Sequence, residues 1–140
     1  MLVGEHDFTA FRGAECQAKT PVRTVALAEV VRQGNLVVFT FRANAFLHHM
    51  IRNLVGSLVY VGCGRQPPTW IGDVLGKTDR RLAAPTFMPD GLYLSAVEYD
   101  RAYDLPKSRG LTPLLGLTLA LGSGPACGPD PKNFVCELSD

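Results

Sequence analysis

The sequence has little net charge, no paired cysteine motif and no long apolar run. Lys and Arg number 14 and Asp and Glu number 13, so the overall charge gives no indication of a nucleic-acid partner. No run reaches the roughly 18 apolar residues that a membrane-spanning helix requires, so we expect no membrane partner. At 140 residues and 46% hydrophobic, the chain fits one soluble folded domain.

The four cysteines are scattered, at Cys16, Cys63, Cys127 and Cys136. None forms a CxxC pair. His48 and His49 are consecutive in sequence, which is not a metal-ligand spacing, so no metal site is expected. Cysteines of this kind without a signal peptide predict a reducing, cytoplasmic location.

Positive charge is nevertheless concentrated in one stretch of the chain. Between residues 12 and 52 there are two acidic residues and six basic ones, namely Arg12, Lys19, Arg23, Arg32, Arg42 and Arg52. A local basic surface of this kind is compatible with RNA, although it is weak evidence taken alone.

Hydrophobic periodicity and turn signals predict six elements in the first hundred residues. In chain order they are a helix over residues 4–12, strands over 23–31 and 36–43, helices over 45–61 and 69–76, and a strand over 91–99. Gln33-Gly34-Asn35 is a turn signal, so the two consecutive strands are expected to form an antiparallel hairpin. Asn44 is the expected cap of the long helix.

That long helix has two different faces at 100° per residue. The apolar face, suited to packing on a sheet, contains Leu47, Met50, Ile51, Leu54 and Leu58. The polar face contains His48, His49, Arg52, Asn53 and Gly56. A face with an arginine and two imidazoles could hold a buried carboxylate or meet a phosphate backbone, and it could equally be a solvated helix face.

The element order indicates an α+β fold, an antiparallel sheet packed by helices. A ferredoxin-like unit runs strand, helix, strand, strand, helix, strand, and the expected order lacks the opening strand. We therefore expect the chain to begin inside such a fold, with a unit over residues 1–103. Residues 104–140 hold five of the ten prolines and five of the fourteen glycines. They are expected to be a poorly ordered tail, or alternatively a patch that covers an exposed sheet edge.

Four motifs in register resemble the tRNA pseudouridine synthase A family. They are GEHDFTAFR from Gly4, CQAKTPVRTV from Cys16, FTFRANAFLHHMIRNLVGSLVYVG from Phe39, and TDRRLAAPTFMPDGLYLSAVEYD, which ends at Asp100. The resemblance covers nearly all of the first hundred residues, and implies the C-terminal half of that catalytic domain.

The resemblance implies isomerisation of uridine to pseudouridine in the tRNA anticodon stem-loop, with tRNA as partner, a homodimer, no metal and no organic cofactor. Arg52 matches the arginine that pairs with the family's nucleophilic aspartate, although it could instead cap a carbonyl or stay solvated. Leu92, Tyr93 and Leu94 match a strand that floors the base pocket, although a core strand would look the same. His48, His49 and Asn53 are expected near the substrate, and Arg23 and Arg42 are expected on the RNA path.

One departure from the family pattern is large. The family's aspartate lies in a G-R-T-D-A-G stretch, which this sequence does not contain, and the stacking tyrosine belongs to the same missing part. Asp79 belongs to a different family segment that is not catalytic, and Asp7 is expected in a helix. We therefore expect a truncated or split product that is inactive alone. The alternatives are a non-catalytic RNA-binding or dimerising module and a degraded product without a stable fold.

Overall fold

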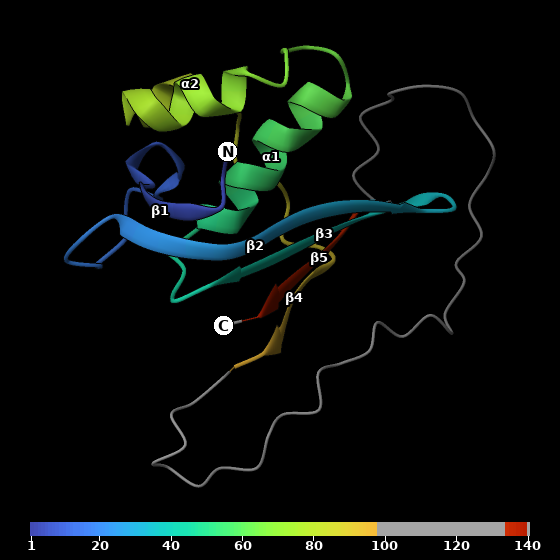
Figure 1. The fold of residues 1–140 in the computed structure, drawn as a ribbon, viewed down its shortest axis with the longest axis horizontal. Coiled ribbons are helices and arrows are strands. Elements are labelled where there is room, and N and C mark those ends of the chain that lie inside the picture. The colour runs from blue at the N-terminus through green and yellow to red at the C-terminus, as the bar shows by residue number, and fades with distance from the viewer. Residues whose placement is uncertain (98–133, 140) are drawn as a thin grey trace, which may run out of the picture.

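The computed structural model describes residues 1–97 and 134–139, and their arrangement is α+β, as predicted (Figure 1). Two α-helices, α1 (Met50–Gly62) and α2 (Trp70–Lys77), lie on the same side of a sheet. The sheet has five strands in the order β1-β2-β3-β5-β4. The strands are β1 (Gly4–Asp7), β2 (Val22–Gln33), β3 (Leu36–Ala43), β4 (Leu92–Ala96) and β5 (Phe134–Ser139), and two short 3-10 helices are η1 (Thr9–Phe11) and η2 (Arg80–Leu82).

The predicted hairpin is confirmed in β2 and β3. The two strands pair antiparallel from Gln33 opposite Leu36 to Val25 opposite Ala43, with a bulge between Val25 and Leu27. Gly34 in the turn has a φ of 61°, a conformation that glycine adopts without steric cost. The hairpin is therefore encoded locally, by its turn and by the β-branched residues on either side.

The helix predicted over residues 4–12 is wrong. Gly4–Asp7 is instead the strand β1, which pairs antiparallel with β2 at the edge of the sheet, from Gly4 opposite Val25 to Asp7 opposite Val22. Only the 3-10 turn η1 follows it. Phe8 and Phe11 are nevertheless both fully buried. A single 3-10 turn places positions i and i+3 on the same side, as a helix would, so the two rings still face the core.

The long helix also begins later than predicted. Helix α1 starts at Met50, and His48 and His49 lie in the turn before it. His49 has a φ of 60°, a left-handed conformation that cannot continue a helix backwards. Asn44 does not cap α1, because its side-chain oxygen accepts a hydrogen bond from the Thr24 backbone nitrogen at 3.0 Å. The second helix, α2, agrees with its prediction to within a residue at each end.

Strand β5 comes from the segment expected to be a poorly ordered tail. It lies between β3 and β4 and pairs parallel with both, from Val37 opposite Phe134 on one side and from Leu92 opposite Cys136 on the other. In a ferredoxin-like sheet the opening strand is central and antiparallel to its neighbours. Here β1 is at the edge and β5 holds the place between β3 and β4. The remaining tail residues, apart from these six, lie outside the described residues.

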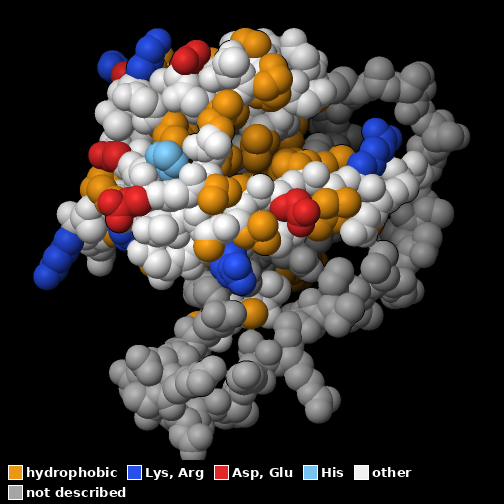
Figure 2. Space-filling view, in the orientation of Figure 1, with side chains coloured by type: hydrophobic (Ala, Val, Ile, Leu, Met, Phe, Trp, Pro, Cys, Tyr) orange, Lys and Arg blue, Asp and Glu red, His pale blue; other side chains and the backbone are white. Residues whose placement is uncertain are grey.

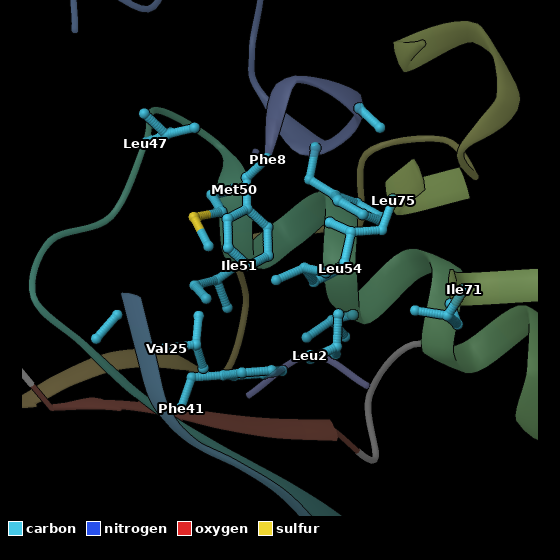
Figure 3. Close-up of a cluster of buried hydrophobic side chains, with 14 of the residues drawn as sticks. Leu2, Phe8, Val25, Phe41, Leu47, Met50, Ile51, Leu54, Ile71 and Leu75 are labelled. Carbon is cyan, nitrogen blue, oxygen red and sulfur yellow. The ribbon is translucent and has the colours of Figure 1, made fainter. Parts of the chain in front are cut away.

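The core lies between the helices and the sheet (Figure 3). Phe8, Phe41, Met50 and Leu54 are fully buried in it, where β1, β3, α1 and α2 meet. Burying a side chain of this size contributes roughly 1.5–3 kcal/mol, so these side chains make a large contribution to the stability of the fold. In the described part of the chain, no helix combines the length and apolarity that a membrane crossing needs.

We predict that replacing Cys136 with proline will detach β5 and open the edge of β3. Cys136 is opposite Phe39 on one side and Leu92 on the other. A proline there removes one ladder hydrogen bond, and its ring disturbs the backbone of a central strand, which destabilises β5 as a whole. Hydrogen exchange should then speed up at backbone amides of β3 and β4, and light scattering should show self-association through the open edge. Amides shared by β1 and β2 serve as the internal control. Unchanged exchange in β3 and β4 would contradict the pairing.

Candidate functional site

Arg52 is held at the start of α1 by the segment that precedes β4. Its Nε donates a hydrogen bond to the Phe87 carbonyl oxygen at 2.7 Å, and the Phe87 backbone nitrogen donates to the Arg52 carbonyl oxygen at 3.2 Å. The side chain is half-buried. Among the described residues, nothing bonds its two terminal nitrogens and no carboxylate pairs with it. The expected alternative, in which Arg52 caps a carbonyl, is therefore correct for its Nε. The two terminal nitrogens, which we call the fork, remain available to bind a carboxylate.

Arg52 also lines a shallow hollow of about 240 Å³, a volume that includes its open mouth. Its lining is mostly apolar, from Ile51, Val55, Phe87, Met88 and Leu92, with Arg52 and Asp90 as the charged members. Of the three predicted floor residues, the structure brings Leu92 to this hollow. Tyr93 and Leu94 lie on the same strand but are 57% and 56% exposed.

Asn53, expected near the substrate, is fully buried instead. Its side-chain nitrogen donates to the Phe11 carbonyl oxygen at 2.8 Å. Its side-chain oxygen accepts from the Thr86 hydroxyl at 2.7 Å and from Arg80 at 3.0 Å. These contacts tie η1, α1 and the segment before β4 together, so the observed role of Asn53 is structural. Contact with a substrate remains a prediction.

Arg80 is the partner that sequence reasoning missed. Besides Asn53, its guanidinium donates to the Ala84 carbonyl oxygen at 2.9 Å and to the Thr86 hydroxyl at 3.2 Å. Burial lowers the pKa of Arg80 below its ordinary value, and these acceptors offset the cost of burying the charge. No local pattern distinguishes Arg80 from Arg81 beside it, which is exposed and pairs with Asp79 at 2.8 Å.

His48 and His49 form a stacked pair, with ring centroids 3.8 Å apart, directly before α1. The turn is held by Gly13, whose backbone nitrogen donates to the His48 carbonyl oxygen at 2.8 Å. A Cβ on Gly13 would be 3.0 Å from that oxygen, a tight contact, so glycine favours this approach. Partial burial, then the charges of His48 and Arg52, lower the pKa of His49 below its ordinary value. His49 is therefore within electrostatic reach of Arg52, although it is not on the same helix.

The two predicted RNA-binding arginines differ in their surroundings. Arg42 is exposed on β3, and Arg23 is half-buried, with its guanidinium donating to the Thr20 and Val22 carbonyl oxygens at 3.0 and 2.6 Å. On the face seen in Figure 2, Lys and Arg side chains are scattered around the rim rather than gathered into one patch. The expected basic surface is therefore not a single cluster on that face.

Two carboxylates near the described motifs are engaged in local turns. Asp79 accepts hydrogen bonds from the Arg81 side chain and backbone, which lower its pKa to about 2, and it caps η2. Asp7 accepts from the Thr9 backbone nitrogen at 2.8 Å. Neither arrangement frees a carboxylate for attack on a nucleotide. Within the described residues, no group of three or more His, Cys, Asp or Glu side chains is placed to hold a metal ion.

Comparison with known proteins agrees with the motif resemblance. The family model described as tRNA pseudouridine synthase matches residues 1–100. The chain belongs to this family. A tRNA pseudouridine synthase A of Herminiimonas arsenicoxydans is 56% identical over 107 residues, which cover 76% of this chain and 39% of that protein. One of Cupriavidus taiwanensis is 61% identical over 105 residues, 75% of this chain and 39% of that protein. One of Bordetella petrii is 56% identical over 114 residues, 81% of this chain and 42% of that protein.

The chain thus spans about two fifths of the length of the curated relatives it matches. The matched region contains α1, α2, η2 and the segment before β4. Arg52 and Phe87, which hydrogen-bonds it, therefore both lie within the family region. Strand β5 lies beyond the residues that the family model matches.

We predict that Asn53→Ala will destabilise the fold by about 2–4 kcal/mol, because it leaves the buried Phe11 carbonyl and the half-buried Arg80 without their partner. Urea denaturation measures this change. Asn44→Ala is the matched control, since Asn44 is exposed and its side chain accepts a single hydrogen bond from Thr24, and it should cost about 1 kcal/mol or less. Equal losses in the two variants would argue against a structural hub at Asn53.

We predict that His49 titrates below the ordinary histidine value of about 6.5, and that Arg52→Ala raises its pKa part of the way back. Partial burial and His48 remain in that variant, so recovery is incomplete. The folded state binds the His49 proton more weakly than the unfolded chain. Stability is therefore lost as pH falls from about 6.5 through the lower folded-state pKa. NMR titration of the His49 ring tests this, with exposed Arg32→Ala as control, and an unmoved pKa in Arg52→Ala would refute it.

Proposed function

We propose that this chain provides the arginine side of a tRNA pseudouridine synthase active site. The observation that carries the proposal is the geometry of Arg52 in a chain of this family. Its Nε is committed to the Phe87 carbonyl oxygen, and Arg52 is one of the residues that line a mostly apolar hollow. A guanidinium fixed in this way can bind one carboxylate through two parallel hydrogen bonds, which only a planar, permanently charged group allows.

The carboxylate would be the family's nucleophilic aspartate, supplied by a segment outside these 140 residues. Pairing with a fixed positive charge keeps a carboxylate ionised and aimed, which is the state in which it attacks a nucleotide. The apolar wall of the hollow suits the flat face of a uracil base that has been turned out of the RNA. The substrate we propose is uridine in the anticodon stem-loop of tRNA.

The assembly we propose is a homodimer in the cytoplasm that uses neither a metal nor an organic cofactor. Cys16 is a free thiol, which supports a reducing compartment. Exposed apolar side chains at the far end of the hairpin, Val30, Val31 and Leu36, are available for self-association. Family membership supports the homodimer and the lack of a metal or organic cofactor.

A second candidate function is RNA binding without catalysis. Exposed His48 and Arg42 favour it, because both can contact phosphate or base without any nucleophile. The two functions differ in one measurable respect, since a binding module retains tRNA affinity and produces no pseudouridine under any condition.

We predict that the 140-residue chain alone makes no pseudouridine, whereas a hybrid in which it replaces the matching region of the Herminiimonas arsenicoxydans relative is active. In that hybrid, Arg52→Ala should lower kcat by about 100-fold or more, because the nucleophile loses the charge that holds it ionised. Arg52→Lys should recover part of the loss, since lysine restores the charge without the fork. Pseudouridine formed in an unmodified tRNA transcript is the measurement.

An inactive hybrid that still binds tRNA would favour the binding module. An Arg52→Ala hybrid as active as the parent would refute the role proposed for the arginine. Turnover by the isolated chain would require another nucleophile, and Asp90, which borders the hollow beside Arg52, would then be the first residue to replace.

A further inference from the structure

Residues 84–87, in the segment that leads to β4, run along the first two turns of α1. We name these four residues the strap. At one end the Ala84 backbone nitrogen donates to the Ser57 hydroxyl at 3.2 Å. One turn of helix earlier, the Thr86 hydroxyl donates to the Asn53 side-chain oxygen at 2.7 Å. Each step along the strap therefore meets a residue nearer the start of α1, and the strap follows the helix in the opposite direction.

The strap ends on Arg52. Backbone bonds of Phe87 hold both the main chain and the Nε of Arg52, at 3.2 and 2.7 Å. Because Nε lies in the plane of the guanidinium, this bond fixes the direction of the fork as well as its position. A displacement of the Phe87 carbonyl oxygen would therefore turn the fork with it.

Gly56 is the point of closest approach between α1 and the strap. It lies one turn beyond Arg52, on the same face of the helix. A Cβ placed on Gly56 would be 2.5 Å from the Pro85 carbonyl oxygen. That oxygen belongs to the backbone and has no rotamer to escape into, so the strap would have to move outward by about 1 Å to restore van der Waals contact.

We propose that Gly56 is a positioning residue, which acts through the strap to aim the Arg52 fork. The absence of a side chain at Gly56 lets the strap lie flat on α1, and the strap in turn places the Phe87 carbonyl oxygen on the arginine. Catalytic relevance rests on the function proposed above, whereas the physical link from Gly56 to Arg52 does not. A displacement of about 1 Å is enough to cost on the order of 100-fold in a positioned reaction.

The first experiment measures hydrogen exchange at the Arg52 Nε–H by NMR in the 140-residue chain, with the resonance assigned by its loss in Arg52→Lys. Gly56→Ala should speed this exchange by about tenfold or more, because the bond to Phe87 is weakened. Gly62→Ala is the matched control, since Gly62 ends the same helix and a Cβ there meets nothing within 4 Å. Unchanged exchange in a folded Gly56→Ala chain overturns the proposal.

A second variant decides the matter if Gly56→Ala does not fold. Thr86→Val keeps the side-chain volume at an exposed position and removes the hydroxyl that bonds Asn53 and Arg80. The strap is then held less firmly beside Phe87, and Arg52 Nε–H exchange should again be faster than in the parent chain. Exchange that stays at the parent rate in Thr86→Val also overturns the proposal.

The catalytic arm uses the hybrid enzyme. Gly56→Ala should lower kcat by about 10- to 100-fold with KM for tRNA changed less than about threefold, and Gly62→Ala should change neither. Faster exchange with an unchanged kcat overturns the positioning role while the arginine assignment stands. Equal activity of the Arg52→Ala hybrid and its parent refutes the proposed function, and the exchange measurement then still reports whether Gly56 controls the arginine.

Discussion

The buried side-chain amide of Asn53 is the contact on which the rest of the site depends. It bonds the carbonyl oxygen of Phe11 in η1, the hydroxyl of Thr86 in the strap and the guanidinium of Arg80. An amide is suited to this place because it donates and accepts without carrying a charge that would have to be desolvated. Removing it would leave the buried Phe11 carbonyl unpaired and would take a partner from Arg80 and Thr86 at the same time, so the three segments are held as a unit.

The position of Arg52 follows from this unit. Asn53 and Arg80 fix Thr86, the next residue along the chain is Phe87, and the Phe87 carbonyl oxygen receives the Arg52 Nε–H. Arg52 is thus the sequence neighbour of Asn53, and Asn53 also holds the strap residue that precedes Phe87. A long side chain would otherwise sample many rotamers, and this closed path removes most of that freedom before any partner arrives.

Local patterns in the sequence predicted part of this arrangement. The hairpin of β2 and β3 and the helix α2 agree with their predictions, because turn residues and helical periodicity act over a few neighbouring residues. The same periodicity failed at α1, where Leu47 and Met50 are both buried but only Met50 is helical. The contact of Gly13 with His48 holds residues before Met50 in a turn, and Gly13 is too distant in sequence to enter a local pattern.

What the sequence by itself determined is the family, the α+β class and the identity of Arg52 as the distinctive residue of its helix, because several motifs in register carry that information. What only the tertiary structure decided is the role of that residue's neighbours. Asn53 lies beside Arg52 in sequence and shares its predicted polar face, yet the fold buries one and leaves the other bordering a hollow. The reason is physical: the strap and η1 meet α1 at Asn53, and contacts between segments far apart in the chain leave no trace in local periodicity.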